Sequence, residues 1–223
     1  MQIQLPKPLQ PMFSPPPNPS NTIFMDFSSD NKALDTLDLS DTLQMNRFVF
    51  GQMEAAGATY GFGGYMEDRA IYRRSTHFTP SDGPARSIHL GVDIWVKAGS
   101  PVFLPLAGKV HSFQVNDTYG DYGPTIIMEH TLPGQALYTL YGHLSPDSLQ
   151  DLVQGKTFRA GEELCRVGDF PVNGDWPPHL HFQLITDMMG NTGDFPGVCL
   201  PEEKQAYKVL CPDPIVFFPE LNR

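Results

Sequence analysis

The chain has little positive charge for its 223 residues. Lys and Arg number 15 against 25 Asp and Glu, which gives a formal net charge of −10 at pH 7. Surfaces that bind nucleic acid or anionic membranes need clustered positive charge, so this balance argues against both partners. No apolar run approaches the roughly 18 residues that a membrane span requires.

Cysteine is also scarce, with Cys165, Cys199 and Cys211 far apart in the sequence and no CxxC pair. An odd number without close spacing argues against a disulfide framework and against a zinc site built from thiolates. We therefore interpret the cysteines as small core residues of a reduced protein. The first residues lack a basic stretch followed by an apolar one, so we expect a cytoplasmic location, with export by another route left open.

Length and a hydrophobic content of 40% predict a single good core. Residues 1–30 hold seven prolines and are expected to lie extended along the body or a neighbouring subunit. Residues 31–84 form a subregion with one helix over Thr42–Ala56, closed by Gly57. Within it, residues 57–64 look like a glycine-rich turn, and residues 67–69 (Glu-Asp-Arg) look like surface or a local ion pair.

Residues 85–223 are expected to form a β domain, because short apolar runs alternate there with Gly, Pro and Asn-Asp turns. The absence of long helical patterns between the runs indicates an antiparallel sandwich or barrel-like fold. One short helix is predicted over residues 145–154, with Ser145 as its N-cap and Pro146 at its first position. The predicted strands are 88–96, 101–106, 108–115, 125–129, 136–141, 157–160, 163–167 and 179–184.

The strand at 179–184 carries two histidines. His179 and His181 are two apart, so both imidazoles project from one face, with Cα atoms about 6–7 Å apart. One ring could bind a metal while its neighbour faces whatever the metal binds. The pair alone is equally compatible with two ordinary sheet histidines.

Two further motifs strengthen the case for a metal. His89 and Asp93 would lie about 13 Å apart on an extended strand, too far for one ion, but Gly91 between them permits a bend. A histidine, a carboxylate and a distant histidine leave a fourth position open, as catalytic zinc requires. An ordinary ion pair is the alternative for His89 and Asp93. His143 ends an alternating strand, whereas the other histidines (77, 111 and 130) lack such companions and are interpreted as structural.

The order His-x-x-x-Asp, Tyr-Gly-His-Leu and His-x-His-Phe resembles the lysostaphin/LytM-type zinc endopeptidases of peptidase family M23. The resemblance covers residues 89–184 and implies a compact antiparallel β fold, the duplicated hybrid motif of that family. It implies His89, Asp93 and His181 as Zn²⁺ ligands. It also implies His143 and His179 as unliganded catalytic histidines facing the attacking water and the scissile carbonyl, without saying which is the base.

The flanks (residues 63–72, 193–198 and 211–214) resemble a branch of the family also found fused to class III aminotransferase-like and small-molecule kinase-like domains. That context implies a metabolic partner enzyme in the cytoplasm.

We predict a zinc metallopeptidase that cleaves a peptide or cell-wall-type amide, with a peptide or peptidoglycan-derived substrate. The alternative is a non-catalytic LytM-like module that binds or regulates a partner. A histidine phosphocarrier is a third interpretation, which Asp93 disfavours because its carboxylate would repel phosphate. The oligomeric state is not predicted.

Overall fold

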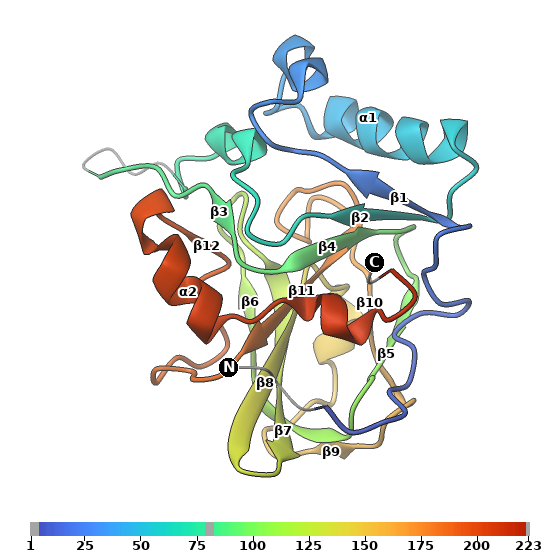
Figure 1. Cartoon of the computed structure of the whole chain (residues 1–223), viewed down its shortest axis with the longest axis vertical. Helices are drawn as coiled ribbons and strands as arrows, with labels where there is room; N and C mark the ends of the chain where they lie inside the picture. Colours follow the sequence, from blue (N-terminus) through green and yellow to red (C-terminus); the bar gives the residue numbers. More distant parts are fainter. Residues whose placement is uncertain (1–4, 79–82, 222–223) are drawn as a thin grey trace.

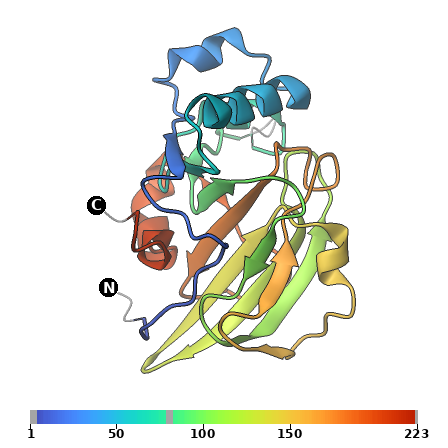
Figure 2. The same cartoon turned by 90° about the vertical axis from the view of Figure 1, so that its right-hand side faces the viewer.

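The computed structural model describes residues 5–78 and 83–221, and within them the chain is mainly β, as predicted. One eight-stranded sheet dominates the molecule (Figures 1 and 2). Neighbouring strands pair antiparallel except β1 and β2, which are parallel. In order across the sheet the strands are β1 (Thr22–Met25), β2 (Tyr60–Gly63), β4 (Val92–Trp95), β11 (His179–Ile185), β8 (Gln135–Gly142), β7 (Gly123–Leu132), β6 (Gly108–Asn116) and β9 (Thr157–Phe158).

The other elements are two small sheets, two α-helices and several 3-10 turns. Two small antiparallel sheets pair β10 (Glu163–Arg166) with β5 (Pro101–Phe103) and β12 (Val198–Cys199) with β3 (Ile88–His89). The α-helices are α1 (Thr42–Ala55) and α2 (Lys204–Leu210), and the 3-10 turns are η1 (Lys32–Thr36), η2 (Ala70–Arg74), η3 (Pro146–Leu149), η4 (Pro201–Glu203) and η5 (Pro214–Phe217). None of the helices in the described residues is long and apolar enough to cross a membrane.

Strand β11 is the centre of the sheet and is buried along its whole length. Its apolar side chains Leu180, Phe182 and Leu184 belong to the main hydrophobic core. Because side chains alternate along a strand, its two histidines project from the opposite face. In register, His181 lies between Asp93 of β4 and Gly142 of β8, so strand pairing alone brings the three sequence motifs together.

The predicted strand over residues 88–96 is broken in the structure. It divides into β3 and β4, which pair with different strands, and the chain bends at Gly91 between them. This is the bend that the His-x-x-x-Asp spacing required.

Helix α1 confirms the predicted helix almost to the residue. The Asp41 side chain accepts a hydrogen bond from the Gln44 amide at its start, and Gly57 follows its end with a φ of +63°. The helix lies above β1 and β2 (Figure 1), and its buried Met45 and Val49 belong to the same hydrophobic cluster as Met25 of β1. The helix therefore covers one end of the sheet.

The turn predicted at residues 57–64 is wrong over its second half, which is strand β2. A Cβ on Gly61 would lie 3.3 Å from the Trp95 side chain, and one on Gly63 would lie 2.5 Å from it. These glycines therefore allow close packing against the indole ring, which composition cannot distinguish from a turn. Strands β1 and β2 join the main sheet, and the proposed boundaries near residues 30 and 84 stay predictions.

The helix predicted over residues 145–154 is also wrong beyond its first turn. Only the 3-10 turn η3 forms, and the Ser145 hydroxyl contacts the Ser148 hydroxyl instead of capping a backbone amide. Helix α2 was not predicted. The proline-rich segment from residue 5 to residue 21 forms no helix or strand. It packs along the same chain: Met12 and Phe13 are buried, and the Phe103 amide donates to the Met12 carbonyl at 2.9 Å.

Candidate metal centre

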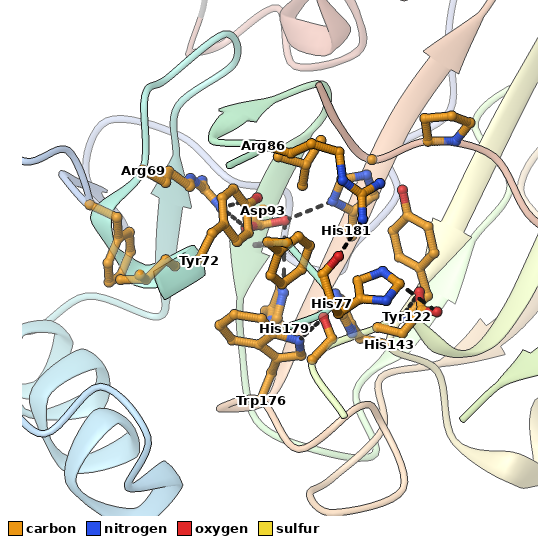
Figure 3. Close-up of a pocket in the computed structure, with 18 of the residues that line it drawn as sticks. Arg69, Tyr72, His77, Arg86, Asp93, Tyr122, His143, Trp176, His179 and His181 are labelled. Carbon is orange, nitrogen blue, oxygen red and sulfur yellow. Dashed lines mark hydrogen bonds and ion pairs between the residues drawn. The ribbon is translucent and has the colours of Figure 1, made fainter. Parts of the chain in front are cut away.

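Three side-chain atoms converge beside strand β11. His89 Nε2 lies 3.0 Å from His181 Nδ1, and Asp93 Oδ1 lies 3.3 Å and 3.2 Å from these two nitrogens. All three residues are buried, and Figure 3 shows Asp93 and His181 facing each other across the site. The structure therefore brings the predicted ligand set into one cluster.

Outer hydrogen bonds determine which nitrogen of each histidine is free. His89 Nδ1 donates to the Gly64 carbonyl at 3.0 Å, which leaves Nε2 with a lone pair. His181 Nε2 donates to Gln183 Oε1 at 2.9 Å, which leaves Nδ1 with a lone pair. The Gln183 amide is itself oriented, because its nitrogen donates to the Pro196 carbonyl at 3.0 Å. Such outer contacts set ligand tautomers in metal sites.

The converging atoms fit a metal ion. Two nitrogen lone pairs and a carboxylate oxygen face one another, so the cluster has three acceptors and no donor of its own. A cation between them relieves that repulsion. Two imidazoles and one carboxylate are a donor set typical of catalytic zinc, with the fourth position open.

The protonation states also suit metal binding. Burial, aided by the nearby Arg69 charge, lowers the pKa of His89 to about 4. Burial would raise the pKa of Asp93, but His89 and Arg69 outweigh it and hold that pKa well below its usual value. Both groups are therefore deprotonated at neutral pH, which is the form that binds a metal.

His143 follows directly after β8 in an unusual backbone conformation. Its φ is +62°, a left-handed value that costs a non-glycine residue about 1–2 kcal/mol. Two hydrogen bonds hold it there: its amide donates to the Tyr122 carbonyl at 2.7 Å, and its Nδ1 donates to the Asn173 carbonyl at 2.7 Å. Strain of this kind is typical of functional positions.

His179 begins β11 beside His143. Its Nδ1 donates to the Pro177 carbonyl at 2.7 Å, and its ring stacks on Trp95 with centroids 5.5 Å apart. The centroids of the two histidine rings are 4.2 Å apart, and His179 Nε2 lies 3.8 Å from Asp93 Oδ1. Burial lowers the pKa of both His143 and His179, so each presents an unprotonated Nε2 at neutral pH.

A cavity of about 200 Å³ opens onto these histidines (Figure 3). Its walls combine aromatic side chains with charged and polar ones, such as Arg86 and Asp194, and helix α1 contributes two apolar side chains. The apolar lining includes Phe27, Met45, Val49, Tyr72, Phe78, Trp95, Trp176 and Phe195.

Of the three histidines interpreted as structural, His111 and His130 have partners outside the cluster, whereas His77 lines the same cavity. His130 is buried and bonded to the Ala107 carbonyl and the Thr139 hydroxyl, and His111 contacts the Ser112 hydroxyl. His77 lies in the cavity wall, with its Nε2 3.8 Å from Asp121.

Arg69 is the residue near the site that sequence reasoning missed. It does pair with Glu67, as one interpretation held, but it is buried and its Nη1 also bonds Asp93 Oδ2. The surface interpretation is therefore wrong for Arg69, whereas Asp68 is exposed. The apolar residues 70–72 that follow Arg69 are the one local sign of its burial.

Residues 87–193 match the model of peptidase family M23. Solved structures with similarity to the chain include a zinc containing peptidase from Vibrio cholerae, with 24% identity and a TM-score of 0.34 over 47% of this chain and 29% of that one. The catalytic domain of the antimicrobial peptidase lysostaphin from Staphylococcus simulans has 24% identity and a TM-score of 0.38, over 55% and 80% of the two chains. LytU has 22% identity and a TM-score of 0.43, over 64% and 80%.

No curated protein matches the chain. The similarity spans less than a third of the Vibrio cholerae peptidase. The matched segment contains the three clustered ligand residues and the two further histidines, from His89 to His181, on a mainly β framework. Over this segment, which is slightly less than half of the chain, the sequence matches peptidase family M23.

Proposed function

We propose that the chain is a zinc-dependent hydrolase that cleaves a peptide or a related amide bond. The observation that carries this proposal is the convergence of three acceptor atoms, from His89, Asp93 and His181, beside two further histidines. The family match over the same residues supports it.

Zinc, when bound, would supply a positive charge that acidifies a water molecule and polarises a carbonyl group. The chain itself supplies proton transfer. One of His143 and His179 accepts the proton of the attacking water at Nε2, because its Nδ1 proton is already committed to a backbone carbonyl. The other faces the scissile carbonyl and donates a hydrogen bond to the oxyanion once its own Nε2 has taken up a proton, which makes it an imidazolium because its Nδ1 keeps the proton that it donates to a backbone carbonyl. Aromatic side chains of the cavity wall, such as Trp95 and Trp176, lower the local polarity relative to water, which strengthens both interactions.

Metal content tests the proposal first. We expect about one zinc per chain, by elemental analysis of protein purified without a chelator or a histidine tag. His181→Ala should lose this zinc, since two ligands remain. His111→Ala is the matched control and should keep it, because His111 contacts Ser112 and Tyr138 and is not one of the three converging ligands. A folded wild-type chain that refuses added zinc would overturn the proposal.

The proposed function also includes a class of substrate. A peptide or a peptidoglycan-derived fragment is the class that we would screen, with a cytoplasmic location and a metabolic partner enzyme as further expectations. The second candidate is a non-catalytic module that binds or regulates such a partner. The completeness of the five-residue set favours hydrolysis over it. Zinc-loaded protein that cleaves neither synthetic peptides nor cell-wall fragments, yet co-purifies with a specific enzyme, would favour the module.

A further inference from the structure

The segment from Gly64 to Arg69 lies against the first ligand strand, although it precedes the family-matched residues. The Met66 amide donates to the His89 carbonyl, and the His89 amide donates to the Glu67 carbonyl, both at 2.9 Å. The Gly64 carbonyl accepts from the His89 ring. This upstream segment therefore fixes both the backbone and the tautomer of one candidate ligand.

Arg69 extends the same support to a second ligand. Its Nη1 bonds Asp93 Oδ2, the carboxylate oxygen that faces away from the histidine nitrogens. Its Nε donates to Glu67 Oε2 at 2.8 Å, and Glu67 Oε1 accepts from the Phe27 amide at 3.2 Å. A continuous chain of polar contacts thus runs from the backbone near β1 to the metal cluster.

Aromatic rings enclose the guanidinium group. Its central carbon lies 5.7 Å from the ring centroid of Phe27 and 5.9 Å from those of Tyr72 and Trp95. A Cβ on Gly63 would lie 2.8 Å from Nη2, so the neighbouring strand is packed directly against it. Arg69 therefore has little freedom to turn away from Asp93 (Figure 3).

We propose that Arg69 is a positioning residue of the metal centre, which holds Asp93 so that only Oδ1 faces the metal. The inference rests on the proposed function. A carboxylate with both oxygens available can rotate or bind through both, and either change would occupy or distort the open position that a water and a substrate need. Engaging Oδ2 with a planar, permanently charged group prevents both. Glu67 supports the arginine from its far side.

The proposal is tested by Arg69→Met, which keeps an unbranched side chain of similar length without the charge, and by Arg69→Lys, which keeps the charge without the planar fork. Zinc affinity is measured by chelator competition. Coordination is followed by the visible spectrum of the Co²⁺-substituted protein, because band position and intensity depend on coordination number. We expect zinc affinity to fall about 10- to 100-fold in Arg69→Met, with an altered Co²⁺ spectrum. Arg69→Lys should lie between that variant and wild type.

Arg47→Met, on the exposed side of α1, is the matched control and should change neither readout. A folded Arg69→Met protein with wild-type zinc affinity and Co²⁺ spectrum would show that Arg69 only packs, and would overturn the proposal. Tighter zinc binding with an unchanged spectrum would also overturn it, because the arginine would then act by charge repulsion alone.

Burial of two carboxylates without a cation can prevent folding of Arg69→Met. Glu67→Gln then provides the test, because it keeps the Arg69–Asp93 pair and weakens its support. We expect a several-fold loss of zinc affinity in the same direction, and no loss would overturn the proposal. Failure of the wild-type chain to bind zinc would instead refute the proposed function, so the two failures are distinguishable.

Discussion

Gly91 offers the sharpest test of the metal cluster, because its missing side chain makes room for a ligand. A Cβ added there would lie 2.7 Å from the Phe182 carbonyl oxygen and 2.8 Å from both Cε1 and Nε2 of His181. Contacts of this kind are ordinarily 3.4 Å or more, so the ring contacts are short by about 0.6 Å (3.4 minus 2.8). The Phe182 carbonyl belongs to the central strand and cannot retreat. The imidazole must therefore move.

Gly91→Ala should accordingly displace His181 and disturb its hydrogen bond to Gln183. We expect zinc affinity to fall about 10- to 100-fold, as for loss of an outer-shell contact. Overpacking should also destabilise the metal-free protein by about 1–3 kcal/mol, which lowers Tm by about 2–12 °C for a chain of this size. Chelator competition and thermal unfolding measure the two effects.

The control is Gly51→Ala in α1, where an added Cβ meets nothing within 4 Å. It should leave zinc affinity unchanged and stabilise the protein by up to about 1 kcal/mol. Zinc affinity within two-fold of wild type in Gly91→Ala would refute the reasoning, because it would mean that His181 is not a ligand or that its position is not restricted by Gly91.

Three other predictions concern different parts of the molecule. His143→Ala should keep zinc and lower hydrolysis by about 10²–10⁴-fold; an unchanged rate would remove His143 from the mechanism. His130 is buried and its pKa is lowered, mainly by burial, so below its unfolded value of 6.5 the unfolded chain binds a proton that the folded chain does not. The free energy of unfolding in urea should therefore fall as pH drops from 7 to 5, and His130→Gln should show a shallower fall; equal slopes would contradict this. Thr42→Val removes the hydroxyl that lies 2.8 Å from the Asp175 carboxylate, and should lower Tm by about 2–4 °C for a loss near 1 kcal/mol. An unchanged Tm would mean that this contact does not secure α1 to the loop.

The sequence by itself determined some of the local elements and the chemical types at the site. Alternation marked the strand with His179 and His181, helical spacing with a terminal glycine marked α1, and the motif order indicated five residues that the structure brings together. These signals are readable because side-chain periodicity and capping depend on residues a few positions apart.

Only the tertiary structure decided which residues meet and what surrounds them. His181 and Asp93 are 88 positions apart, and their contact depends on the register of β11 against β4. Arg69 and Asp93 are 24 apart, with no periodicity linking them, so an arginine that looked like surface is buried at the cluster. Gly63 looked like a turn residue because glycine is common in turns. The sequence does not show that the Trp95 indole ring occupies the space beside it. Packing brings distant segments into contact, and a local sequence pattern does not show which side chains those segments place around a residue.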